Sequence, residues 1–223
     1  MLSTDSFSLI AALVALSLLP FVAMVATSYL KIVVVMSLIR NALGIQSIPP
    51  NMVINALALI LTFYIMAPRI EKSWEIVSTK MAANRPEKVL RTDILAEAGE
   101  PFREFLVQET GEKQKAFFVS TAEKLWAVPD GQGRLKPATV DPNSYFVLVP
   151  AFCVSELTKA FQIGFLVYLP FIAIDIVISN ILLAMGMMMV SPVTISLPFK
   201  LLLFVMIDGW TLLVHGLVQS YMH

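Results

Sequence analysis

The chain has 223 residues, of which 57% are hydrophobic and only 14% are charged. Soluble domains are about half apolar and a quarter charged, so this composition indicates a membrane protein. Lysine plus arginine and aspartate plus glutamate each number 16, and this balance gives no reason to expect a nucleic-acid partner. The single cysteine, Cys153, excludes an internal disulfide and a cysteine-based zinc site, and we expect no metal or cofactor.

Two apolar runs in the first third of the chain are predicted to be helices. Residues 7–30 are long enough to span a bilayer, whereas residues 52–67 lie at the short end and stop at Pro68. The start of the chain lacks the basic region of a secretory signal peptide, so we interpret the first run as a retained helix. Between the runs, Asn41-Ala42-Leu43-Gly44 predicts a helix end with Gly44 as its left-handed cap.

A polar segment follows. Between Arg69 and Asp141 lie 12 basic and 12 acidic residues, which is 24 of the 32 charges in the chain. Periodic apolar positions predict amphipathic helices over 71–81 and 97–107, with 113–126 as a third candidate. The expected fold is all-α: an N-terminal helical hairpin (1–68), a small, mainly helical, extracytoplasmic insert (69–149) and a C-terminal helical hairpin (150–223).

A methionine cluster lies between the last two apolar runs, which cover roughly 161–184 and 195–218. It reads Met185-Gly186-Met187-Met188-Met189-Val190-Ser191-Pro192, and we expect Gly186 and Pro192 to act as hinges. Methionine is flexible and polarizable, so the cluster could line an adaptable constriction or fill a gap between helices. Met185, Met188 and Met189 share a face if the helix continues, and Met187 joins them only if Gly186 breaks it.

Three charges interrupt the C-terminal apolar runs. Asp175, Lys200 and Asp208 would each cost about 2.5–3.5 kcal/mol at mid-bilayer, so we expect them to face protein or water. Lys200 and Asp208 are eight apart, near one face of a continuous helix, and Asp175 is a candidate partner for Lys200. A buried ion pair that fixes helix register is favoured over a proton or ion relay. Glu156 and Lys159 are spaced to pair on a helix, either as a surface pair or as a functional one.

Basic residues near the apolar runs predict the topology. Lys31 and Arg40 follow the first run and Lys200 lies between the third and fourth, so both junctions are expected to be cytoplasmic. Both termini and residues 69–149 would then be periplasmic. No nucleotide-binding, metalloprotease or serine-hydrolase motif is present, and no histidine precedes His215. We therefore expect no enzymatic activity.

Several segments carry a resemblance to a known family. They are Lys31–Pro68 (with Arg40-Asn41-Ala42-Leu43-Gly44 and Met66-Ala67-Pro68), Pro150–Phe165 continuing to Leu169-Pro170-Phe171, Leu183–Pro192, and Pro198–Trp210. They resemble the inner-membrane export-apparatus family of type III secretion systems, SctR in injectisomes and FliP in flagella. The match covers most of the chain outside about residues 70–145. The short chain without an evident cleavable signal favours the injectisome branch.

The resemblance implies a protein-conducting export gate in the bacterial inner membrane. Five copies would assemble with SctT-like and SctS-like subunits and a docked SctU-like protein, in contact with membrane lipid and largely above the bilayer plane. Unfolded secreted proteins would be the substrates. Carried over to this sequence, the gasket around the closed pore comprises Met187, Met188 and Met189, with Met185 beside them. The rival hypotheses are an ion or solute transporter that uses Asp175 and Asp208, and a purely structural membrane scaffold.

Overall fold

The computed structural model describes residues 10, 13–14, 17–18, 20–45, 48–83, 92–129 and 135–222. This part of the chain is predominantly helical, with one short two-stranded sheet, which confirms the all-α prediction. The chain forms two compact units, Met1–Leu30 with Met66–Glu156, and Lys31–Ile65 with Leu157–His223. The predicted first helix, 7–30, lies partly outside the described residues.

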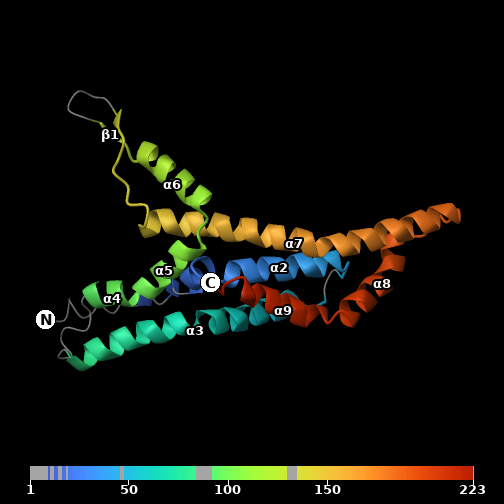
Figure 1. Cartoon of the computed structure of the whole chain (residues 1–223), viewed down its shortest axis with the longest axis horizontal. Helices are drawn as coiled ribbons and strands as arrows, with labels where there is room; N and C mark the ends of the chain where they lie inside the picture. The colour runs from blue at the N-terminus through green and yellow to red at the C-terminus, as the bar shows by residue number, and fades with distance from the viewer. Residues whose placement is uncertain are drawn as a thin grey trace. The chain divides into compact units, whose positions relative to one another are not determined.

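The elements follow one another in chain order along the colours of Figure 1. They are α2 (Tyr29–Ala42), α3 (Asn51–Ala83), α4 (Thr92–Ala98), α5 (Glu100–Glu109), α6 (Glu112–Leu125), β1 (Val128–Pro129), β2 (Leu135–Lys136), α7 (Tyr145–Ala184), α8 (Pro192–Met206) and α9 (Gly209–Gln219).

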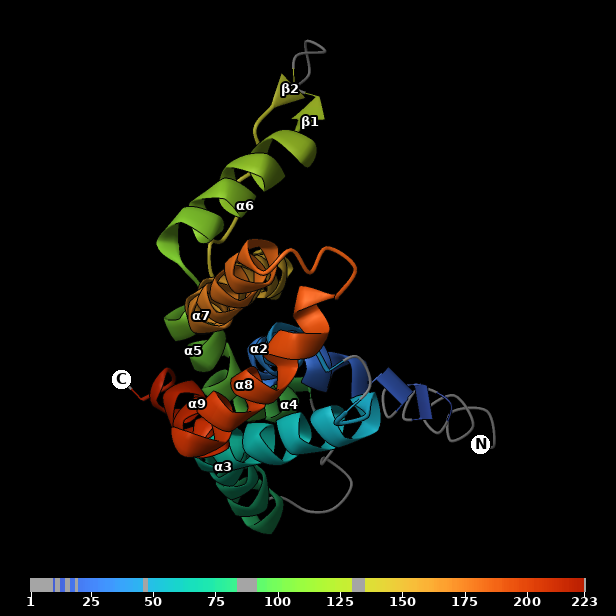
Figure 2. The same cartoon turned by 90° about the vertical axis from the view of Figure 1, so that its right-hand side faces the viewer.

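The first unit holds the polar segment. The buried rings of Phe105 and Phe152 pack with their centroids 5.6 Å apart. The Ser155 hydroxyl accepts a hydrogen bond from the Gly111 N–H (3.0 Å) and donates one to the Glu109 carbonyl (3.3 Å), so it fastens the α5–α6 connection to α7. A short antiparallel hairpin, β1 with β2, extends beyond the end of α6 (Figure 2). The helix predicted over 113–126 is α6, whereas the one predicted over 97–107 is divided between α4 and α5.

Pro68 does not end a helix. The separate helices predicted over 52–67 and 71–81 are one helix, α3, which continues through Pro68. An interior proline removes one backbone hydrogen bond and costs about 3 kcal/mol. The neighbouring residues compensate locally, because Met66 is almost fully buried and good helix formers follow the proline.

The second unit is built on α2. Its residues Ile32, Val35, Met36 and Ile39 are at most 1% exposed and follow the spacing of one helical face. The helix ends at Ala42, and Gly44 has a φ of +77°, which confirms the predicted left-handed cap. A helix whose apolar face is this completely covered is the core of its unit.

The fourth apolar run is not one helix. α8 ends at Met206 and α9 begins at Gly209, with their axes bent by 61°. Asp208 lies at the bend in the left-handed region, with a φ of 50° and a ψ of 53°. The ring of Phe204 packs edge-on against Trp210 and at a tilt against Phe171, with centroids 5.4 and 6.5 Å away. The close approach of Phe204 to Gly209 leaves no room there for a Cβ.

Two helices in the described ranges are long and apolar enough to cross a membrane, Asn51–Lys80 and Tyr145–Ala184. The bent pair α8–α9 makes a third if it counts as one span. At about 1.5 Å per residue, the 40 residues of α7 extend about 60 Å, twice the roughly 30 Å hydrocarbon core of a bilayer. Only part of α7 can therefore lie within the hydrocarbon.

Two glycines of α9 give a matched test of this packing. Gly209→Ala forces a methyl group into the Phe204 ring, and we expect it to destabilise the chain by about 1–3 kcal/mol. Gly216→Ala meets open space and should stabilise the helix by about 0.5–1 kcal/mol. Thermal unfolding of the purified chain in detergent, followed by circular dichroism, measures both. Equal shifts in Tm for the two variants would contradict the packing at Gly209.

Candidate functional site

The methionine loop begins where the backbone conformation of Gly186 ends α7. Gly186 has a φ of +70°, its N–H donates to the Leu183 carbonyl (3.0 Å), and the Met187 N–H donates to the Leu182 carbonyl (2.9 Å). These paired bonds form a Schellman motif, which satisfies the last carbonyls of a helix and requires a left-handed residue. A Cβ built at Gly186 meets nothing within 4 Å, so the backbone conformation, not the available space, calls for glycine.

The loop ends at Pro192, the first residue of α8, where a missing N–H is tolerated and the fixed φ suits a helix. Ser191 before it is extended, with a φ of −69° and a ψ of 117°. α8 turns back from the end of α7 (Figure 1). Both expected hinge residues, Gly186 and Pro192, therefore stand at the two ends of the loop.

The four methionines of the loop point away from the core of their own chain. Their exposed fractions are 67% for Met185, 41% for Met187, 83% for Met188 and 102% for Met189. None of them fills a gap between the helices of this chain. Because Gly186 ends the helix, the four side chains do not follow a single helical face.

An ion pair with a buried ammonium joins α7 and α8, the helices on either side of the loop. The Lys200 ammonium donates to Asp175 Oδ2 at 2.6 Å and to the Ala42 carbonyl at 3.2 Å. The other carboxylate oxygen, Asp175 Oδ1, accepts a hydrogen bond from the Ser196 hydroxyl at 2.6 Å. The Lys200 side chain is 4% exposed and that of Asp175 is 31% exposed.

This network connects three helices. Asp175 precedes the loop on α7, Ser196 and Lys200 follow it on α8, and Ala42 is the last residue of α2. The carbonyl end of a helix carries a partial negative charge, so the end of α2 and the Asp175 carboxylate both attract the Lys200 ammonium. Removing the Asp175 carboxylate would leave the Lys200 ammonium in a poorly solvated site.

The structure separates Asp208 from this network. Lys200 and Asp208 do not share a helix face, because the chain breaks between them, and Asp208 is exposed at the start of α9 without a side-chain cap bond. Glu156 is fully buried on α7, whereas Lys159 is partly exposed. Pairing between these two stays a prediction.

Sequence reasoning missed two polar contacts of the second unit. Ser196 lies one helical turn before Lys200, and that spacing could have suggested its place beside Asp175. Lys31 is 1% exposed inside α2, and its Nζ lies 3.4 Å from the centroid of the Tyr221 ring, a contact without a local signal. Lys31 and Lys200 are thus buried helix residues and not the loop charges assumed in the topology prediction.

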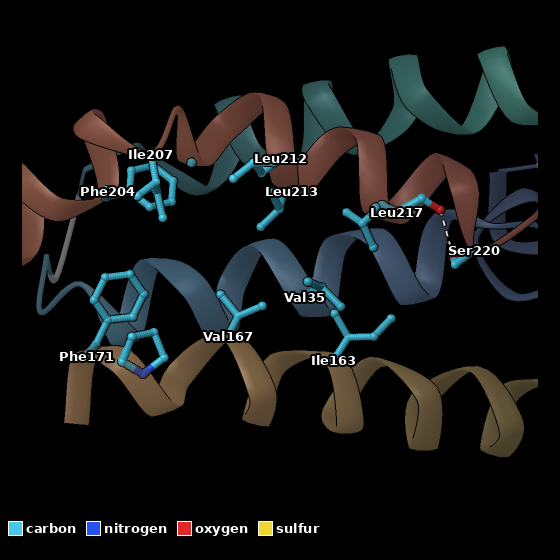
Figure 3. A pocket seen from close by; sticks show the side chains of 13 residues that line it. Val35, Ile163, Val167, Phe171, Phe204, Ile207, Leu212, Leu213, Leu217 and Ser220 are labelled. Atoms are coloured by element: carbon cyan, nitrogen blue, oxygen red, sulfur yellow. Dashed lines mark hydrogen bonds between the residues drawn. The ribbon is translucent and has the colours of Figure 1, made fainter. Parts of the chain in front are cut away.

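The second unit also contains a partly open apolar pocket of about 460 Å³. Figure 3 shows Leu213 of α9 and Val167 of α7 pointing toward one another across it. Its other lining residues come from α2, α7, α8, α9 and the bend between the last two: Val35, Ile163, Pro170, Phe171, Phe204, Ile207, Gly209, Leu212, Gly216, Leu217 and Ser220.

Known proteins resemble the chain over nearly its whole length. It is 51% identical over 218 residues to Yop proteins translocation protein R of Yersinia pestis, with 97% of each chain covered. It is 46% identical over 222 residues to the hypersensitivity response secretion protein HrcR of Ralstonia nicotianae, over 99% of this chain and 100% of that protein. It is 42% identical to the flagellar biosynthetic protein FliP of Pectobacterium carotovorum, over 98% of this chain and 80% of that protein.

The FliP family matches residues 12–217, which is nearly all of the chain. Family, helical fold and relatives agree with the resemblance carried by the motifs at both ends of the sequence. The chain belongs to the FliP family of secretion-system export components.

Proposed function

We propose that the chain is a core subunit of the inner-membrane export gate of a type III protein secretion system, and that its methionine loop lines the closed pore. The observation that carries this proposal is the exposure of Met185, Met187, Met188 and Met189 on a loop whose two ends are fixed. Clustered exposed apolar side chains mark a contact surface, so the loop is suited to meet other copies or a substrate.

Methionine suits a gasket for a physical reason. An unfolded substrate presents every kind of side chain, and a flexible thioether can repack around each of them. At rest, a ring of such side chains excludes water and ions. Five copies assembled with SctS-, SctT- and SctU-like subunits would bring the loops together, with unfolded secreted proteins as substrates.

The relatives favour the injectisome branch. Identity is 46–51% to Yop proteins translocation protein R, to HrcR and to the virulence protein YscR, and 40–42% to the flagellar proteins. Placement of the termini and of residues 69–149 in the periplasm is part of the proposal and rests on Arg40, since Lys31 and Lys200 are buried. The length of α7 supports a complex that projects above the bilayer plane.

Asp175 and Lys200 have a structural role in this proposal. The carboxylate binds two groups on α8 from its place on α7, so it sets the register of the two arms that carry the loop. A transporter that uses Asp175 would have to break these contacts to bind an ion.

A native mass measurement of the chain co-expressed with its partner subunits separates the two classes: a gate gives a large hetero-oligomer, whereas a transporter gives a small oligomer that moves solute alone.

The gasket is tested by replacing Met187, Met188 and Met189 together with alanine. Assembly should be retained because these side chains are exposed, and ion conductance should rise because the seal is lost. Membrane conductance of reconstituted complexes and secretion by intact cells are the measurements. The matched control replaces Met52, Met206 and Met222, which are also largely exposed, and should not raise conductance. Normal conductance with normal secretion in the loop variant would contradict the gasket proposal.

The ion pair is tested by a double-mutant cycle. Asp175→Leu leaves the Lys200 ammonium buried opposite an apolar side chain and should destabilise the chain by about 3–5 kcal/mol. Adding Lys200→Met removes that buried charge, so the double variant should be more stable than Asp175→Leu alone. Thermal unfolding in detergent and recovery of the assembled complex are the readouts. If the loss of stability in the double variant equalled the sum of the losses in Asp175→Leu and in Lys200→Met, the two side chains would not act together.

The backbone requirement at Gly186 is tested by two substitutions. Asparagine tolerates the left-handed region far better than valine, so Gly186→Asn should retain assembly and secretion better than Gly186→Val. Valine there favours continuation of α7 and moves the methionines onto a helical face. Secretion assays with matched expression levels measure the difference, and equal activity of the two variants would argue against a fixed turn.

A further inference from the structure

The last helix, α9, and the two residues after it, Ser220 and Tyr221, form a strap over the second unit. Of the 11 residues of α9, three are buried: Gly209, Leu213 and Leu217. Tyr221 is buried too, so the contacts beyond Gly209 recur every four residues along one helical face. The partly open pocket lies between this strap and the helices α2 and α7 (Figure 3). A single row of side chains therefore holds the strap against its unit.

The strap begins at a strained residue. Asp208 has a φ of 50° and a ψ of 53°, a left-handed conformation that raises the free energy of an L-residue and suits glycine. The first amides of a helix have no partner within it, and Asp208 gives α9 no side-chain cap bond. In one straight helix Asp208 would be right-handed, and those amides would donate to the last carbonyls of α8. Local backbone energetics thus oppose the 61° bend.

Side-chain packing favours the bend. The Phe204 ring lies against Gly209 and has its centroid 5.4 Å from that of Trp210. At the far end of the strap, the Lys31 ammonium nitrogen lies 3.4 Å from the centroid of the Tyr221 ring, which is a cation–π contact. Straightening the helix would separate Tyr221 from Lys31. A local preference and a tertiary preference therefore oppose one another at Asp208, and such opposition is the condition for two alternative conformations.

We propose that the strap opens and closes about Asp208, and that the contact of Tyr221 with Lys31 is its latch. The structure shows the closed form. In the open form α8 and α9 make one helix, and the pocket walls on α2 and α7 lose their cover. α8 keeps its place, because Lys200 bonds to groups on α7 and α2. The proposal concerns a single chain and does not depend on the proposed export function.

Distances between spin labels, measured by pulsed EPR on the full chain in detergent, test the proposal. One pair joins two exposed positions, Leu166 of α7 and Gln219 of α9, in a Cys153→Ser background that removes the native thiol. At 1.5 Å per residue α9 is about 16 Å long, so a rotation of 61° moves its far end by about 16 Å. The open form should therefore add a second, longer distance. A reference pair, Leu166 with Phe199 of α8, should keep its distance.

Two substitutions at Asp208 should shift the equilibrium in opposite directions. Both remove the carboxylate, but glycine tolerates the left-handed conformation, whereas alanine favours the straight helix. Asp208→Gly should show the closed distance. Asp208→Ala should raise the ratio of open to closed chains by about five- to thirty-fold relative to Asp208→Gly.

The latch has its own matched pair of variants. Tyr221→Ala removes the ring over Lys31 and should raise the open fraction, whereas Tyr221→Phe keeps a ring there and should behave as the unaltered chain. The double variant, Asp208→Ala with Tyr221→Ala, should have the largest open fraction.

Three outcomes would overturn the proposal. The first is a single, closed distance between Leu166 and Gln219 in the double variant with the reference pair unchanged, which would show a fixed corner. The second is a reference distance that lengthens in a folded single variant, because α8 would then be the moving element. If the double variant unfolds, Asp208→Ala decides alone, and a ratio equal to that of Asp208→Gly is the third.

Discussion

The second unit depends on one buried ammonium group. Lys200 contacts a carboxylate on α7 and the carbonyl end of α2 from its place on α8, so a single side chain joins three helices. A charge this deeply buried is tolerated only when its partners are fixed, and the same contacts fix the partners. The methionine loop lies between Asp175 and Lys200 in sequence. The ion pair therefore joins α7 and α8, the helices on either side of the loop.

Local chemistry and tertiary packing determine different parts of this arrangement. The Schellman turn at Gly186 is a property of a few residues, and so is the cap at Gly44. At position 186 the turn depends on the backbone alone, because a Cβ there would contact no neighbouring atom. The 61° bend between α8 and α9 instead depends on packing, since Gly209 admits the Phe204 ring only when the two helices turn against one another.

The same division explains which features the sequence could predict. The cap at Gly44, the helix α6 and the all-α class follow from local patterns, and the structure confirms them. Pro68 and Asp208 were misjudged because local propensity was overridden: α3 accepts an interior proline, and a left-handed aspartate interrupts an apolar run. Asp175 was a recognisable candidate partner for Lys200. The place of Lys31 beneath Tyr221 was not predictable, because the two residues are far apart in the chain.

That separation has a consequence for biosynthesis. The second unit combines Lys31–Ile65 with Leu157–His223, and the contact of Lys200 with Ala42 spans 158 residues. α2 is therefore synthesised long before the helices that cover its apolar face and the groups that pair with its polar ones. Contacts across such long loops form late, and the exposed intermediate is prone to misassembly. Until α9 and Tyr221 have been made, α2 lacks part of the packing that it has in the finished unit.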